Sequence, residues 1–139
     1  MSNYNISKNF ILPEFISKEQ WEKHGMKMQW AIDERIVQSV QALRENLNVP
    51  LTINNWFWGG LRNESGLRVK GMKNYKPRSQ HSYGRAVDVI SSIPANEMRK
   101  HIFSNREKYP FITAIELDVG WLHIDCRFTN TNNIMTFRP

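Results

Sequence analysis

Apolar residues recur at steps of three and four along one N-terminal stretch: Ile32, Ile36, Val40, Leu43 and Leu47. This spacing places them on one face and predicts a helix over 29–47, which Pro50 prevents from continuing. Upstream, Ser17 and Gln20 form a capping-box pattern, and Gly25 is typical of a helix end. A short helix is therefore predicted over 18–24.

After Pro50 the pattern changes to short runs rich in β-branched and aromatic residues. These runs predict strands at 51–53, 86–90, 111–116, 121–128 and 134–137. Ser92 and Pro94 are typical of a helix start and predict a helix over about 94–104. Helices come first, and strands follow with short connections. This order predicts an α+β fold, with N-terminal helices packed on a small, mainly antiparallel sheet.

The composition fits one folded domain spanning 1–139. Of the 139 residues, 40% are hydrophobic and 12% aromatic, so the chain can bury a core and global disorder is excluded. The net charge of +6 suits an anionic partner. Cys126 is the only cysteine, which excludes an internal disulfide and a multi-cysteine metal site. We expect its side chain to be buried and to face away from that of the neighbouring Asp125.

No apolar run approaches the roughly 18–20 residues of a membrane span, so we expect none. The polar N-terminus does not resemble a secretory signal peptide. We therefore expect the protein to be cytoplasmic as synthesised, with a phage-type route as one way for it to reach the cell wall. The sequence leaves its oligomeric state open.

Residues 54–84 predict a long irregular segment, because they hold five of the seven glycines together with many Asn, Ser and basic residues. Loops of this length in a compact domain are usually functional or disordered. Aromatic and basic residues that alternate in this way also fit a nucleic-acid surface. However, Trp56 and Trp58 directly follow a predicted strand and are expected to pack against the core, and no nucleic-acid motif is present. We expect no nucleic-acid partner.

Two of the four histidines have carboxylates at suggestive spacings. His81 precedes Asp88 by seven residues, and a tight turn at Gly84 would bring the two side chains to one centre. His123, on a neighbouring strand, would add a second imidazole, as a catalytic zinc site requires. Asp125 shares a strand face with His123 and would orient either histidine. Spacing alone leaves another interpretation open, in which His81 lies on a surface loop and Asp88 caps a turn.

Three blocks resemble the zinc D-Ala-D-Ala metallopeptidases, which share their fold with the Hedgehog signalling domain. Residues 79–88 match Ser-x-His-x-x-Gly-x-Ala-x-Asp at all five fixed positions, and 116–125 match Glu-x-x-x-x-Trp-x-His-x-Asp. Ser65-Gly66-Leu67-Arg68 resembles the upstream Ser-Gly-x-Arg element. The resemblance implies one Zn²⁺ held by His81, Asp88 and His123.

The resemblance also implies roles for residues around the ion. Arg68 would bind or polarise a carbonyl or carboxylate of the substrate, and Ser79 and Gln80 would contact substrate or brace the His81 loop. Trp121 and Tyr83 would pack around the site and exclude water.

The general base is open. Some branches of the family place a glutamate three residues before the last zinc histidine, where this chain has Gly120. The remaining candidates are Glu116, which we favour, and Asp118. Both lie at odd offsets from His123, so a bulge or turn near Gly120 would be needed to bring either to its side.

The resemblance implies a metallopeptidase that cleaves the peptides of bacterial peptidoglycan, either as a carboxypeptidase or as an endopeptidase, through a metal-activated water. The alternative is a non-catalytic module on the same fold that binds the cell wall or belongs to a phage structure.

Overall fold

The computed structural model describes residues 3–139, and a five-stranded sheet of order β1-β2-β4-β3-β5 lies at its centre. The strands are β1 (Leu51–Thr52), β2 (Ala86–Ser91), β3 (Ala114–Glu116), β4 (Leu122–Asp125) and β5 (Met135–Phe137). Neighbouring strands are antiparallel except β3 and β5, which are parallel. The predicted α+β class with a mainly antiparallel sheet is confirmed. The predicted strands at 111–116 and 121–128 are shorter than expected.

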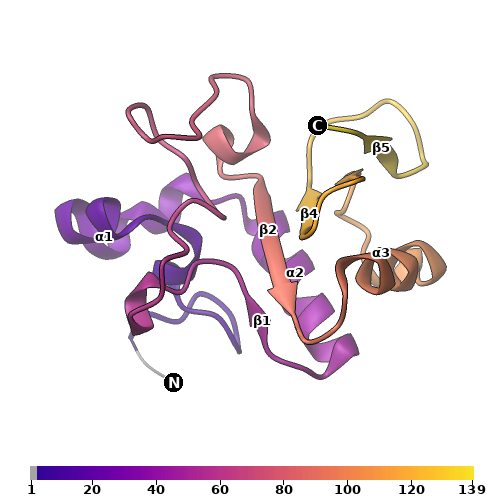
Figure 1. Ribbon diagram of the computed structural model, residues 1–139, viewed down its shortest axis with the longest axis horizontal. Coiled ribbons are helices and arrows are strands. Elements are labelled where there is room, and N and C mark those ends of the chain that lie inside the picture. The colour runs from indigo at the N-terminus through magenta and orange to yellow at the C-terminus, as the bar shows by residue number, and fades with distance from the viewer. Residues whose placement is uncertain (1–2) are drawn as a thin grey trace.

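The helices of the described chain are α1 (Lys18–His24), α2 (Glu34–Leu47) and α3 (Ala95–Ser104). Figure 1 shows α2 behind β2, with α1 and α3 at opposite ends of the molecule. The predicted caps of α1 are confirmed, because the Ser17 side chain accepts a hydrogen bond from the Gln20 amide and Gly25 ends the helix with φ of 58°. Among residues 3–139, no helix is long and apolar enough to cross a bilayer.

The predicted start of the second helix, at residue 29, is wrong. A 3₁₀ segment covers Gly25–Ala31, and α2 begins only at Glu34. Asp33 explains the break, because its side chain caps α2 and its backbone N–H donates to the Gly84 carbonyl at 2.9 Å. The backbone at Ile32, just before this hydrogen bond, is extended. A helix continuous from residue 29 would need helical angles there, so α2 cannot begin earlier.

The alternation of side chains along β2 and β4 separates the core from the opposite face of the sheet. Val87 and Val89 of β2, with Leu122 and Ile124 of β4, belong to the apolar core that also buries the α2 stripe. The intervening residues, which include Asp88 and His123, therefore point to the other side. Cys126 is buried in the core, as predicted.

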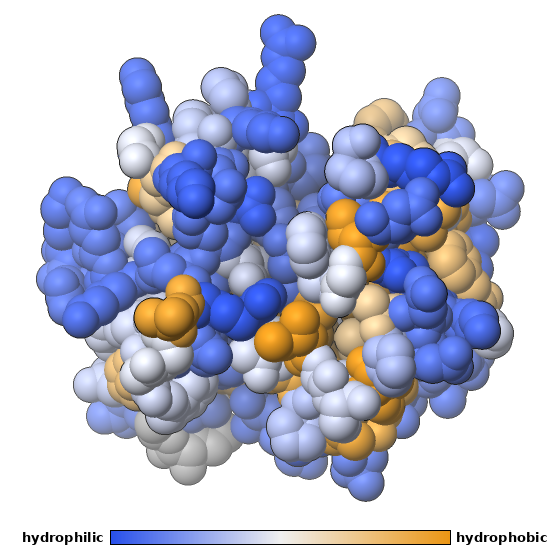
Figure 2. All heavy atoms as spheres, in the orientation of Figure 1, coloured by the Kyte–Doolittle hydropathy of each residue, from blue (hydrophilic) through white to orange (hydrophobic). Residues whose placement is uncertain are grey.

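The segment 54–84, which runs to the left of β2 and above it in Figure 1, is irregular, as predicted, apart from the short 3₁₀ turns Trp56–Trp58 and Gln80–Tyr83. It is anchored at Gly66, where a Cβ atom would lie 2.3 Å from the Phe15 carbonyl oxygen, so only glycine fits. The Leu67 amide donates to that same oxygen at 2.8 Å. Figure 2 shows mostly hydrophilic side chains over the upper left of the molecule, where part of this segment runs.

The expectation that both tryptophans after β1 pack in the core is wrong for Trp58. Trp56 is half-buried and its indole N–H donates to the Ile16 carbonyl at 2.8 Å. Trp58 is 62% exposed, because the turn Trp56–Trp58 rotates it outward.

One buried acid, Glu14, makes the stability of this fold depend on pH. It lies beside the Phe15 anchor, is only 7% exposed, and accepts a hydrogen bond from the Ile11 amide at 2.9 Å. Burial raises the pKa of Glu14 from 4.5 to about 7, although that hydrogen bond acts to lower it. Because this pKa is higher in the folded than in the unfolded state, the contribution of Glu14 to the free energy of unfolding is fully present below pH 4.5. That contribution is lost as pH rises through 7.

We predict that Glu14→Gln, which keeps the hydrogen-bond acceptor but cannot ionise, removes this pH dependence. The free energy of unfolding of the variant, relative to the natural protein, should rise by about 3 kcal/mol between pH 4 and pH 8. Urea unfolding followed by tryptophan fluorescence at both pH values measures this. The exposed change Glu22→Gln is the control, and equal behaviour of the two variants would contradict the prediction.

Candidate metal centre

His81 is positioned by a tight turn at the start of β2. The turn Gln80–Tyr83 is capped by Ser79, whose hydroxyl accepts a hydrogen bond from the His81 amide at 3.2 Å. It ends at Gly84 with φ of 66°, and a Cβ atom there would lie 1.9 Å from the Ala31 carbonyl oxygen. The turn predicted at Gly84 is therefore present, and its close packing against the chain before α2 requires glycine.

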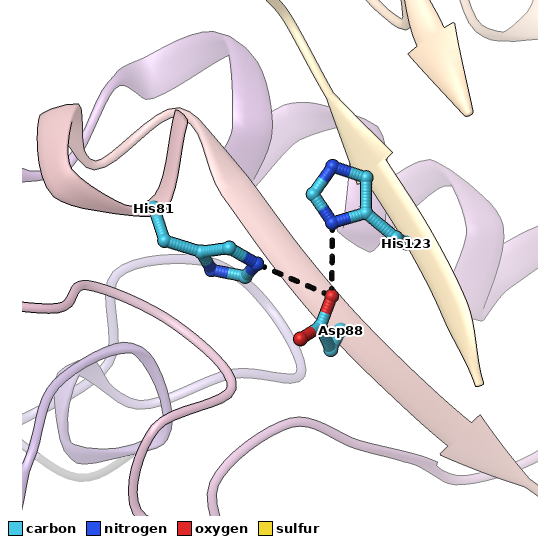
Figure 3. Close-up of side chains that lie close together, drawn as sticks. All are labelled: His81, Asp88 and His123. Atoms are coloured by element: carbon cyan, nitrogen blue, oxygen red, sulfur yellow. Dashed lines mark hydrogen bonds and ion pairs between the residues drawn. The ribbon is translucent and has the colours of Figure 1, made fainter. Parts of the chain in front are cut away.

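Sheet register places the other two side chains. Asp88 of β2 and His123 of β4 are direct partners in the antiparallel pair, so their side chains lie next to each other on one face. Figure 3 shows His81 approaching Asp88 from the preceding turn while His123 approaches from β4. The structure thus brings together the three residues predicted as metal ligands.

The three side chains converge on a single carboxylate oxygen. Oδ1 of Asp88 lies 3.2 Å from Nε2 of His81 and 3.0 Å from Nδ1 of His123 (Figure 3). All three residues are buried, and the potential ligand atoms lie within 4.8 Å of one another. A tetrahedral ion with bonds of about 2.0–2.1 Å separates its ligands by roughly 3.3 Å. Two imidazoles and a carboxylate at these distances therefore fit one metal ion.

Both histidines also make a hydrogen bond through the ring nitrogen that faces away from Asp88. Nδ1 of His81 donates to the Gly66 carbonyl at 2.8 Å, which leaves Nε2 for the centre. Nε2 of His123 lies 2.7 Å from Oδ2 of Asp125, so Asp125 orients His123 rather than His81. Outer hydrogen bonds of this kind fix the ring orientation and tautomer of metal-binding histidines.

The second oxygen of Asp88 is occupied by Arg68. Nη2 of Arg68 lies 3.1 Å from Oδ2 of Asp88, and Nε donates to the Glu64 carbonyl at 2.7 Å. The Asp88 backbone N–H also donates to the Ser65 carbonyl at 2.8 Å. The segment that resembles Ser-Gly-x-Arg therefore supports both Asp88 and His81.

Charge compensation shifts the pKa values of the centre. Burial acts to raise the pKa of Asp88, but hydrogen bonds from His123 and His81 outweigh burial and hold that pKa well below its usual range. Burial acts to lower the pKa of His123, yet its hydrogen bonds to Asp125 and Asp88 raise it to about 9. A metal ion would therefore have to displace a proton from His123 at neutral pH, and its binding would weaken as pH falls.

The centre lines a cavity of about 1000 Å³. Its walls also include most of the other predicted site residues: Arg68, Ser79, Gln80, Glu116 and Trp121. Asp118 is not among the lining residues; it has φ of 60°, is exposed, and pairs with Arg138 at 2.5 Å. The chain reversal that precedes β4 thus uses a left-handed Asp118 rather than a left-handed Gly120. Of the two predicted candidates for the base, Glu116, at the end of β3, is the one that lines the cavity.

Two aromatic residues expected to pack around the site are partly open to solvent. Trp121 lines the cavity but is 39% exposed. Tyr83 is 52% exposed, so the expectation that it packs against the site is wrong. It is the last residue of the His81 turn, with the Arg85 guanidinium carbon 5.3 Å from its ring centre.

Sequence reasoning missed two arginines. Buried Arg99 of α3 donates to the backbone carbonyls of Glu116, Val119 and Trp121, and so holds the loop between β3 and β4. Arg127 contacts Asp125 behind His123. One feature of the sequence could have indicated the role of Arg99: it is a charged residue between the apolar positions Met98 and Ile102 of a predicted helix.

Comparisons of the chain with protein-family models, with curated proteins and with solved structures find no match. The chain is an α+β protein with a buried group of two histidines and an aspartate whose ligand atoms lie close enough together that they could hold a metal ion.

We predict that the natural protein binds about one Zn²⁺ per chain, and that His81→Ala, Asp88→Ala and His123→Ala each abolish this stoichiometric binding. Elemental analysis after dialysis at pH 8 measures the bound metal. His24→Ala, an exposed histidine on α1, is the matched control and should keep the full metal content. Retention of metal by all three site variants would exclude this centre.

Proposed function

We propose that this protein is a zinc-dependent peptidase that hydrolyses peptide bonds in the stem peptides of bacterial peptidoglycan. The observation that carries this proposal is the convergence of His81, Asp88 and His123 within 4.8 Å in the wall of a large cavity. The three sequence blocks that resemble D-Ala-D-Ala metallopeptidases supply the substrate class.

The donor set fits Zn²⁺. Two imidazole nitrogens and one carboxylate oxygen are typical of catalytic zinc sites, which keep a further position open. When bound, the ion supplies Lewis-acid chemistry, which makes water acidic near neutral pH and polarises a carbonyl group. Because Arg68 occupies Oδ2 of Asp88, that carboxylate would bind through Oδ1 alone.

Glu116 is our candidate for the general base. Glu116 lines the same cavity, and within residues 3–139 it forms no ion pair, although its charge acts on Arg127. A carboxylate in this place would accept the proton of the attacking water and pass it to the leaving amine. The exposed ion pair with Arg138 makes Asp118 the weaker candidate.

Two side chains would bind the substrate. The Arg68 hydrogen bonds within residues 3–139 use Nε and Nη2, so Nη1 is available for a substrate carbonyl or carboxylate. Oε1 of Gln80 is a buried acceptor with no partner in the described chain and would accept an N–H from the substrate peptide. Ser79 already caps the His81 turn, which favours a bracing role over substrate contact.

The charge of the cavity suits an anionic peptide. Arg62, Lys76 and Arg78 line it in addition to Arg68 and Arg127, and they come mostly from the basic segment 54–84. Peptides with free carboxylates, such as stem peptides, would be attracted to this wall.

The alternative is a binding module on the same fold, which would hold the metal and the wall peptide without cleaving it. Substitution of the candidate general base, Glu116, distinguishes the two functions, because only a peptidase needs it. We predict that Glu116→Gln keeps the zinc content but lowers kcat at least 100-fold, because it removes a proton acceptor without removing a ligand.

The assay for this prediction follows new amino groups released from purified peptidoglycan and from a synthetic stem pentapeptide. Asp118→Asn is the matched control and should retain activity. Zinc-loaded natural protein that binds peptidoglycan but releases no amino groups would support the binding module instead. Loss of zinc from Glu116→Gln would show that Glu116 contributes to metal binding rather than acting as the general base.

We further predict that Gln80→Met raises KM for the stem peptide about tenfold with unchanged zinc content, because a substrate N–H loses its acceptor. Gln29→Met, a change at an exposed glutamine outside this cavity, is the control. Steady-state kinetics measures both variants, and an unchanged KM for Gln80→Met would remove this residue from the substrate site.

A further inference from the structure

Arg127 holds the carboxylate that lies behind His123. Its Nε donates to Oδ1 of Asp125 at 2.8 Å, its Nη2 donates to Oδ2 at 2.6 Å, and its backbone N–H donates to Oδ1 at 3.2 Å. Asp125 is fully buried. Together with the contact from His123, both oxygens of this carboxylate are fixed in position and orientation.

This arrangement decides which nitrogen of His123 can bind a metal ion. An ionised carboxylate can only accept hydrogen bonds, so Nε2 of His123, 2.7 Å from Oδ2, must carry the proton. The other ring nitrogen, Nδ1, faces Asp88 at 3.0 Å. Both ring nitrogens therefore face carboxylates. Because Asp125 keeps the proton on Nε2, Nδ1 is the nitrogen that would give up its proton and offer its lone pair to a metal ion.

An aromatic ring holds Arg127 in place. The Arg127 guanidinium carbon lies 4.6 Å from the ring centre of Phe137 on β5, and the same ring makes an edge contact with His123 at a centroid distance of 5.5 Å. The guanidinium thus lies between a carboxylate and an aromatic face. A lysine ammonium lacks the planar fork that such a site requires.

We propose that Arg127 is a positioning residue of the metal centre, which acts through Asp125 to hold His123 in its metal-binding tautomer and orientation and thereby sets the metal affinity. This inference rests on the proposed metal-dependent function. It assigns to Arg127 a role in metal binding without contact between Arg127 and the ion.

The chain contains a matched control for this interaction. Arg35 contacts Asp33 through the same three donors, with its backbone N–H at 2.9 Å, Nε at 3.0 Å and Nη2 at 2.7 Å. Both arginines therefore bind the aspartate two residues earlier in the same way. The Asp33 carboxylate caps α2 and makes no hydrogen bond to a histidine among residues 3–139. Of these two pairs, the Arg127 pair continues to the candidate metal site.

The test compares Zn²⁺ affinities of the natural protein, Arg127→Met and Arg35→Met by competition with a chromophoric chelator at pH 8. We expect Arg127→Met to weaken zinc binding about 10–100-fold, as is typical when an outer partner of a metal ligand is lost. Arg35→Met should bind zinc as the natural protein does. Long-range ¹⁵N–¹H NMR of the histidine rings should show the His123 proton on Nε2 in zinc-loaded natural protein, and a changed signal in Arg127→Met.

Equal zinc affinity and an unchanged His123 signal in Arg127→Met would overturn the proposal. An equal loss of affinity in Arg35→Met would also overturn it, because the effect would then be general. If Arg127→Met does not fold, Arg127→Lys decides: it keeps a positive charge beside Asp125 but not the fork, and natural affinity in that variant would overturn the proposal. Natural protein that binds no zinc would instead refute the proposed function itself.

Discussion

Asp88 carries a negative charge inside the protein, and such a charge is tolerated only where other groups compensate it. His81 and His123 contact one oxygen of its carboxylate, and Arg68 pairs with the other. The compensating groups come from the segment before β2 and from β4, so these parts of the chain must meet at one side chain. The geometry of the candidate centre thus follows from the way in which the fold neutralises a buried acid.

The supports of the centre extend to the N-terminal part of the chain. The carbonyl of Phe15 accepts from Leu67 where Gly66 approaches it closely, and the Gly66 carbonyl in turn accepts from His81. A second connection joins the Gly84 carbonyl to Asp33 at the start of α2. The N-terminal elements therefore fix the His81 loop as well as completing the core.

Local patterns predicted most of the elements, and the family resemblance implied the ligand set, whereas tertiary contacts decided the rest. The caps of α1, the α2 stripe and the turn at Gly84 depend on residues close in sequence, and these predictions are confirmed. The start of α2 depends on a hydrogen bond to Gly84, about fifty residues away, which no local pattern encodes. The roles of Arg99 and Arg127 likewise appear only when α3, β4 and the loop before β4 are packed together.

The charges around the centre also bear on the order of folding and metal binding. Arg68 pairs with Asp88, Arg127 pairs with Asp125, and His123 lies between the two carboxylates with its pKa raised to about 9. At neutral pH the protein's own cations therefore compensate both buried acids. Small zinc domains, by contrast, fold only when the metal gathers their ligands. In this protein the sheet register and the outer hydrogen bonds gather the three candidate ligands, so a metal ion would enter a site that folding has already built.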